Sequence, residues 1–163
     1  MKIKVLFLAA FLLVFAACSR QETGDTGVSV SGDSIEILKS GAMARIKEEH
    51  QGKVLLVNFF ASWCPPCRAE TPDFVKVYGE EKERFSIVGL STDADKDDIA
   101  KFISEFNVNY PVYMSDQSLS MEFGISTIPT SIIYGPDGKL VDIIVGGIPE
   151  KDLKNIISKL SAN

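Results

Sequence analysis

Histidine and cysteine, the side chains that most often hold transition metals, are scarce in this chain: its 163 residues include one histidine and three cysteines. A structural zinc site needs about four ligands. Cys18 lies in a hydrophobic leader, and His50 precedes the strand that leads to the other two cysteines. The sequence therefore predicts no metal site and no bound cofactor.

Basic residues are also few, with 17 Lys and Arg against 22 Asp and Glu and a formal net charge of −5. Nucleic acid attracts proteins with basic surfaces, so we do not expect it as a partner. The length suits one domain with its own core and is short for two. No internal repeat or low-complexity block divides the chain.

A hydrophobic run long enough to span a membrane is missing as well. The apolar stretch at 5–17 is shorter than the roughly 20 residues of a spanning helix, and Lys2 and Lys4 precede it. This pattern is typical of a secretory signal, which we expect to occupy residues 1–17. Residues 18–34 are polar and rich in Gly, Ser and Thr, which predicts a flexible linker before a domain at 35–163.

The most informative stretch is Trp63-Cys64-Pro65-Pro66-Cys67, which directly follows an apolar run at 54–60. A strand that leads into a cysteine pair and then a helix places Cys64 at the helix start and Cys67 one turn further on. Backbone N–H groups and the helix dipole favour the thiolate of Cys64, which we expect to be accessible and to attack a partner disulfide. Cys67 can then attack the mixed disulfide. A purely structural bridge is the alternative, although closing so small a loop removes little chain entropy.

Strands and helices alternate from residue 35 onward. The run at 54–60 is apolar except for Asn58, as in a central strand covered on both faces. Later in the chain, Gly135 to Gly138 form a turn signal between two strands. These patterns predict an α/β fold with a mixed central sheet flanked by helices. The expected strands are 35–38, 54–60, 85–90, 111–114, 130–134 and 140–145, and the expected helices are 42–51, 64–81, 99–106, 118–123 and 153–160.

Two stretches of the sequence resemble the thioredoxin superfamily: residues 57–72, which read VNFFASWCPPCRAETP, and residues 127–130, which read TIPT. More narrowly, residues 35–160 are similar to the TlpA/ResA-type membrane-tethered thiol-disulfide oxidoreductases. The segment between Asp97 and Met114 matches the central insertion that separates this group from plain thioredoxin. The resemblance implies a thioredoxin-like fold with that insertion.

The resemblance also implies two substrate-binding features. Pro129 matches a cis-proline that faces the dithiol and leaves the backbone of Ile128 free to pair with a bound substrate strand. Trp63 matches a tryptophan that shields the dithiol and offers an apolar docking surface. A partly buried packing residue is the alternative for Trp63.

Glu70 matches a carboxylate that ResA-type proteins carry near the active site. Such a group can accept the proton that Cys67 must lose before it attacks. Asn58 stands where thioredoxin has a buried aspartate assigned to proton transfer, and an amide cannot titrate. A solvated residue in the first turns of a helix is the alternative for Glu70.

The residues before Cys18, Phe15-Ala16-Ala17, resemble the lipobox of bacterial lipoproteins, with Phe15 in place of the usual aliphatic residue. This resemblance implies a lipid on Cys18. It would hold the domain in the cell envelope, in the periplasm or at the outer face of the cytoplasmic membrane. Ordinary signal-peptide cleavage after Ser19, which would discard the cysteine, is the alternative.

TlpA/ResA-type proteins take electrons from a membrane thiol carrier and reduce protein disulfides, including those of apocytochrome c. The resemblance therefore implies a reductase with protein disulfide substrates, which we expect to be a monomer. An oxidase or isomerase of secreted proteins is the alternative within the same chemistry. A copper or haem chaperone is a further alternative, but copper-binding relatives usually have three residues between the cysteines and a late histidine, where this chain has two residues and only His50.

Overall fold

The computed structural model of the chain describes residues 31–162. Its elements alternate between strand and helix in the first two thirds of the domain and end in a hairpin and a helix. In chain order they are η1 (Gly32–Ser34), β1 (Ile37–Leu38), α1 (Ala42–Glu49), β2 (Val54–Phe60), α2 (Pro65–Glu81), β3 (Phe85–Ser91), α3 (Lys96–Phe106), β4 (Val112–Ser115), α4 (Gln117–Glu122), β5 (Thr130–Tyr134), β6 (Leu140–Val145) and α5 (Glu150–Ser161).

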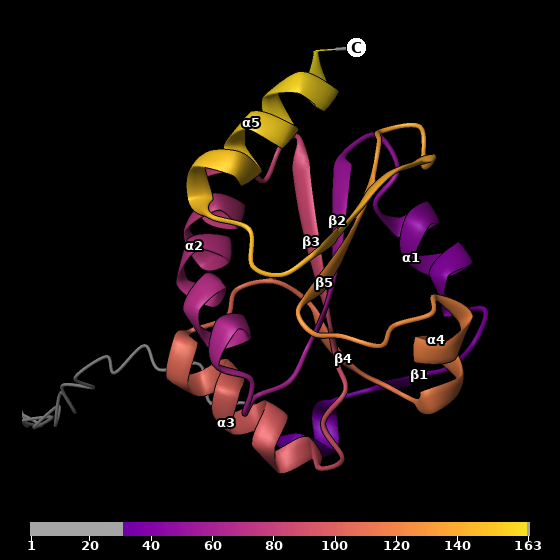
Figure 1. Cartoon of the computed structure of the whole chain (residues 1–163), viewed down its shortest axis with the longest axis vertical. Coiled ribbons are helices and arrows are strands. Elements are labelled where there is room, and N and C mark those ends of the chain that lie inside the picture. Colours follow the sequence, from indigo (N-terminus) through magenta and orange to yellow (C-terminus); the bar gives the residue numbers. More distant parts are fainter. Residues whose placement is uncertain (1–30, 163) are drawn as a thin grey trace, which may run out of the picture.

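One six-stranded sheet forms the centre of the domain, with the strand order β1-β4-β3-β2-β5-β6. The first four strands in this order run parallel, whereas β5 and β6 pair antiparallel. Helices α1 and α4 lie on one face of the sheet and α2, α3 and α5 on the other (Figure 1). The expected mixed sheet with helices on both faces is confirmed.

Strand β2 is the centre of the core, and all seven of its residues are buried. Leu55, Val57 and Phe59 pack toward α1 and α4, while Val54 and Leu56 pack toward α2 and α5. This division follows from the period of two along a strand. Asn58 alternates onto the same face as Leu56, so its polar side chain points toward the helix that carries the cysteines.

Most predicted elements are confirmed, and three strands, β2, β5 and β6, have the predicted bounds. The first predicted strand is shortened to Ile37–Leu38, and the first helix ends two residues before its predicted end. Helix α3 begins at Lys96 because the Asp95 side chain accepts a hydrogen bond from the Asp97 N–H, 2.8 Å, and so caps it.

The predicted flexible linker does not extend to residue 34. Residues 32–34 form a turn of 3₁₀-helix, and the Ser31 hydroxyl accepts a hydrogen bond from the Asp33 N–H. Gly32 is buried against the start of α3, where a Cβ would lie 2.4 Å from Asp97 Oδ1 and 3.2 Å from the Asp97 backbone nitrogen. Composition suggested flexibility, but Gly32 packs so closely that a larger residue would require the Asp97 side chain to move. The signal at 1–17, Cys18 and the rest of the linker lie outside the described residues.

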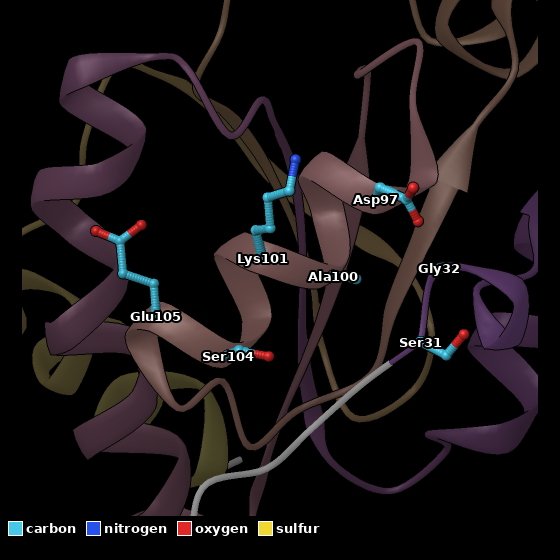
Figure 2. Close-up of a pocket in the computed structure, with 7 residues that line it drawn as sticks. All are labelled: Ser31, Gly32, Asp97, Ala100, Lys101, Ser104 and Glu105. Atoms are coloured by element: carbon cyan, nitrogen blue, oxygen red, sulfur yellow. The ribbon is translucent and has the colours of Figure 1, made fainter.

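Figure 2 shows the surface pocket that this N-terminal arm forms with α3. Lys101 and Glu105 extend from the helix, and Ser31 and Gly32 form the opposite wall. Of the predicted site residues that lie within 31–162, none lines this pocket. Across residues 31–162, no helix combines the length and apolar character needed to cross a bilayer.

Candidate active site

The cysteine pair lies where the central strand leads into α2. Strand β2 ends at Phe60, and Cys64 is the N-cap of α2 with extended backbone angles. Pro65 follows at the first helical position, where its fixed φ suits a helix and its missing N–H costs no hydrogen bond. Cys64 and Cys67 form a disulfide with their Cα atoms 5.3 Å apart.

The start of α2 directs a donor at the first sulfur. The Cys67 N–H points to Cys64 Sγ, with a nitrogen–sulfur distance of 3.4 Å. A backbone donor and the positive end of the helix dipole both favour negative charge on this sulfur once the disulfide is reduced. This geometry agrees with the role predicted for Cys64.

In this oxidised form the Cys64 sulfur is buried, and the accessibility expected of its thiolate in the reduced protein stays a prediction. Cys64 is only 3% exposed and Cys67 1%. The bridge ties the Cys64 sulfur to Cys67 within an apolar cluster that also contains Ala61 and contacts Ile128. Attack on a partner therefore requires that the bridge is first reduced.

A charged clamp holds the loop that precedes the cysteines. Both Asp93 carboxylate oxygens bind Ser62, one accepting from its N–H at 2.8 Å and the other from its hydroxyl at 2.7 Å. The Ser91 hydroxyl also donates to Asp93. On the other side, Arg68 donates to the Ser62 carbonyl at 3.1 Å and pairs with Glu105. Every polar atom of Ser62 is thus held by a charged side chain.

Sequence reasoning missed this clamp, although one signal for Asp93 was present. Asp93 follows β3, which runs parallel to β2 and ends beside it, with Phe60 paired to Ser91. Functional groups gather at the carboxyl ends of adjacent parallel strands. Ser62 and Arg68 gave no comparable signal, because their partners depend on tertiary contacts.

Glu70 lies one helical turn beyond Cys67 on the same side of α2 and is 5% exposed. Its Oε1 accepts a hydrogen bond from Asn58 Nδ2 at 3.0 Å, and its Oε2 accepts one from the Ile148 N–H at 3.1 Å. Asn58 also donates to the Ser131 hydroxyl at 3.0 Å, across the β2–β5 pairing that places these two residues opposite each other. The alternative that Glu70 is a solvated helix residue is wrong.

Burial changes the acidity of Glu70. Loss of solvent raises the pKa of this carboxyl to about 7, and the hydrogen bonds from Ile148 and Asn58 offset only part of that rise. A group that titrates near neutral pH can both take up and release a proton under ordinary conditions. The Asn58 amide, which lies next to this carboxyl, cannot take up or release a proton in this way.

Of the residues expected to contact a substrate, Trp63 directly precedes Cys64, and Ile128 packs against the cluster that contains the bridge. The Ile128–Pro129 peptide bond is cis, as predicted. Trp63 is 69% exposed, so the alternative that it is a packing residue is wrong. Trp63 and Ile128 line a groove of about 510 Å³, and the residues between 31 and 162 that form its wall also include Asp93 and Asp116 but no Lys or Arg.

His50 lies away from the cysteines. Its Nδ1 is 2.9 Å from the hydroxyl of Ser86, near the start of β3, whereas the disulfide follows the end of the neighbouring strand β2. Within residues 31–162, no three His, Cys, Asp or Glu side chains are grouped so that they could hold a metal ion. The structure therefore does not bring together the ligands that the copper-chaperone alternative needs.

By its sheet order and the place of its disulfide, the protein is of the thioredoxin-like class. The sequence model described as Redoxin matches residues 28–158, and the chain belongs to the Redoxin family.

Among curated relatives, the thiol-disulfide oxidoreductase ResA of Bacillus thuringiensis (strain Al Hakam) is 31% identical over 114 residues, which are 68% of this chain and 65% of that protein. The match thus spans less than two thirds of that relative. ResA of Halalkalibacterium halodurans is 28% identical over 145 residues, covering 84% of this chain and 76% of the relative.

Solved structures show the same fold. A thiol:disulfide interchange protein of the thioredoxin family from Chlorobium tepidum is 32% identical, with a TM-score of 0.67 over 71% of this chain and 84% of its own. StoA from Bacillus subtilis is 26% identical, with a TM-score of 0.57 over 64% of this chain and 82% of its own. The resemblance to ResA-type proteins in the sequence is confirmed.

The raised pKa of Glu70 predicts how the stability of the oxidised protein depends on pH. The carboxyl titrates near its ordinary 4.5 when unfolded and at about 7 when folded, so the folded state holds the proton more tightly between these values. The stability that neutral Glu70 contributes is full below pH 4.5 and is lost as the pH rises through 7, a change of about 3 kcal/mol. Urea unfolding of wild type and Glu70→Gln at pH 4.5 and 8 measures it.

The other titratable groups are the same in both proteins. The difference in the free energy of unfolding between wild type and Glu70→Gln therefore reports the titration of this carboxyl alone. We expect wild type to lose about 3 kcal/mol relative to the variant between the two pH values. Parallel pH dependences would show that Glu70 titrates normally in the folded protein.

Proposed function

We propose that this chain is an extracytoplasmic thiol-disulfide oxidoreductase that reduces disulfides in other proteins through Cys64 and Cys67. The observation that supports it best is the Cys64–Cys67 bridge at the start of α2, with the Cys67 N–H directed at the Cys64 sulfur. A bridge that closes so small a loop contributes little as a staple. The names of the ResA relatives point to the same chemistry.

The reaction starts from the reduced form. The Cys64 thiolate attacks one sulfur of a client disulfide; that bond breaks, a mixed disulfide forms, and the second client sulfur leaves as a thiolate that takes up a proton. Cys67 then loses its proton and attacks Cys64 Sγ, which releases the first client sulfur as a thiolate. Two electrons pass to the client, and the protein is left with the bridge observed here.

Glu70 is the proton acceptor for Cys67 in this account. Both residues are buried, so Cys67 cannot lose its proton directly to bulk water. A carboxyl with a pKa near 7 accepts that proton without being permanently protonated or permanently charged. The hydrogen bonds from Asn58 and Ile148 fix its orientation.

Client binding is assigned to the groove between Trp63 and Ile128. An extended client segment would pair with the backbone of Ile128 beside Pro129, and the exposed indole of Trp63 would cover its apolar side chains. Apocytochrome c, whose cysteines must be reduced before haem is attached, is the client to test first.

The direction of electron flow depends on how strongly the Cys64 thiolate is stabilised. Each pKa unit of such stabilisation is worth at most about 30 mV in a two-electron couple. A helix start can direct several N–H groups at a sulfur, but Pro65 and Pro66 have none, which leaves the Cys67 N–H as the donor on Cys64. Limited stabilisation of the thiolate favours a reductant over an oxidant.

A disulfide-exchange assay with insulin as the substrate tests this function. Reduced wild type should cleave the insulin disulfides, and Cys64→Ser should be inactive because it lacks the nucleophile. Cys67→Ser should accumulate a mixed disulfide that gel electrophoresis without reductant detects, since nothing resolves it. Equal trapping by both variants would contradict the assigned roles.

Equilibration of the wild-type Cys64–Cys67 bridge with glutathione measures its reduction potential, which indicates the direction of electron transfer. A reductase should have a potential of about −250 mV or lower, near that of thioredoxin. A potential of about −150 mV or higher would instead establish the oxidase alternative, with the same cysteines and the same site.

The cellular location rests on the N-terminal segment. We propose that the leader is removed and that Cys18 carries a lipid, so that the domain stays close to a membrane thiol donor. Mass spectrometry of the mature protein should find a lipid-modified Cys18 as the first residue. An unmodified N-terminus at Arg20 would remove the anchor and leave a secreted enzyme with unchanged chemistry.

A further inference from the structure

The groups around Glu70 hold its carboxylate but cannot carry its proton away. The Asn58 amide and the Ile148 backbone N–H donate hydrogen bonds to it and do not titrate. Tyr110 is a titratable residue close enough to feel the charge of Glu70. Burial and that charge raise the pKa of the Tyr110 hydroxyl, which is hydrogen-bonded to Thr71. A proton that Glu70 accepts must therefore leave through solvent.

Glu70, which is 5% exposed, lines a surface pocket of about 280 Å³ between the first turns of α2 and the segment that leads into α5. Its walls include Pro66 and Ala69 on one side and Gly147 on the other. Asp73, a second carboxylate on the wall, accepts a hydrogen bond from the Glu150 N–H at 3.0 Å. The residues of the client groove do not line this pocket.

Gly147 lies on the pocket wall close to the Glu70 carboxylate. A Cβ added there would lie 3.6 Å from Glu70 Oε2 and 4.0 Å from the Pro66 carbonyl, which are ordinary contacts. A methyl group therefore fits without strain, whereas a longer apolar side chain would extend across the space in front of the carboxylate. Because residue 147 carries no side chain, nothing from that position covers the 5% of Glu70 that is exposed.

We propose that this pocket is the route by which Glu70 exchanges protons with solvent, and that Gly147 keeps the route open. The inference rests on the role proposed above for Glu70. During client reduction the Cys67 proton moves to a Glu70 oxygen and then to water in the pocket, while the Cys67 electron pair forms the bond to Cys64. During reduction of the bridge the proton travels the same route inward. Proton exchange thus uses a pocket whose wall shares no residue with the client groove.

Gly147→Leu tests the route by filling the pocket. Rapid mixing of the reduced protein with an excess of an activated disulfide forms the mixed disulfide on Cys64 faster than it resolves, and single-turnover kinetics then follow the resolving step. We expect this step to slow about 10-fold at pH 7, part of what a general base contributes, with a larger solvent deuterium isotope effect. Alkylation of Cys64 in the reduced protein should keep its wild-type rate, because that step needs no proton at Glu70.

Gly79→Leu is the matched control, a glycine-to-leucine change in the exposed part of α2 where a Cβ would meet only Asn109 Nδ2, at 3.6 Å. It should leave both the rate and the isotope effect unchanged. If Gly147→Leu does not fold, Ala69→Leu fills the same pocket from an exposed position on the helix. A wild-type resolving rate and isotope effect in the folded pocket variants would overturn the inference.

Glu70→Gln separates this inference from the function on which it rests. A wild-type resolving rate in Glu70→Gln would refute the base role of Glu70 itself. Slow resolution in Glu70→Gln combined with fast resolution in Gly147→Leu would refute only the solvent route through the pocket.

Discussion

The contact between the Cys67 N–H and the Cys64 sulfur is the interaction on which the rest of the site depends. It exists because β2, buried on both faces, fixes the point at which the chain leaves the sheet, and because Cys64 caps the helix that follows. The Ser62 clamp then holds the connecting loop from both sides. A buried strand, a helix start and two charged side chains together set the position of one sulfur.

The second constraint is the burial of Glu70. An isolated carboxylate is costly to bury, and the protein reduces that cost with two hydrogen bonds rather than with a positive charge. An ion pair would lower the pKa of the carboxyl and keep it ionised, whereas burial with neutral donors raises it to about 7. The site therefore keeps an acid that can change its protonation state one helical turn beyond Cys67.

Much of the fold and part of the site could be predicted from the sequence. The apolar run of β2 and the cysteine motif after it are local patterns, and they indicated both the sheet and the bridge correctly. The hydrogen bonds of Glu70 could not be predicted, because Ser131 faces Asn58 only through the β2–β5 register and Ile148 arrives from the end of the chain. Gly32 was misinterpreted for the same reason, since its contact with Asp97 is not visible in composition.

The most direct test of the account is the ionisation of Cys64 in the reduced protein. The rate of its alkylation by iodoacetamide, followed from pH 4 to 10 in Cys67→Ser so that only this thiol reacts, reports the thiolate fraction. Because a backbone donor and a helix start favour the charged sulfur, we predict a midpoint at about pH 7, below the value of about 8.5 for free cysteine. A midpoint at or above that of free cysteine would contradict the central claim.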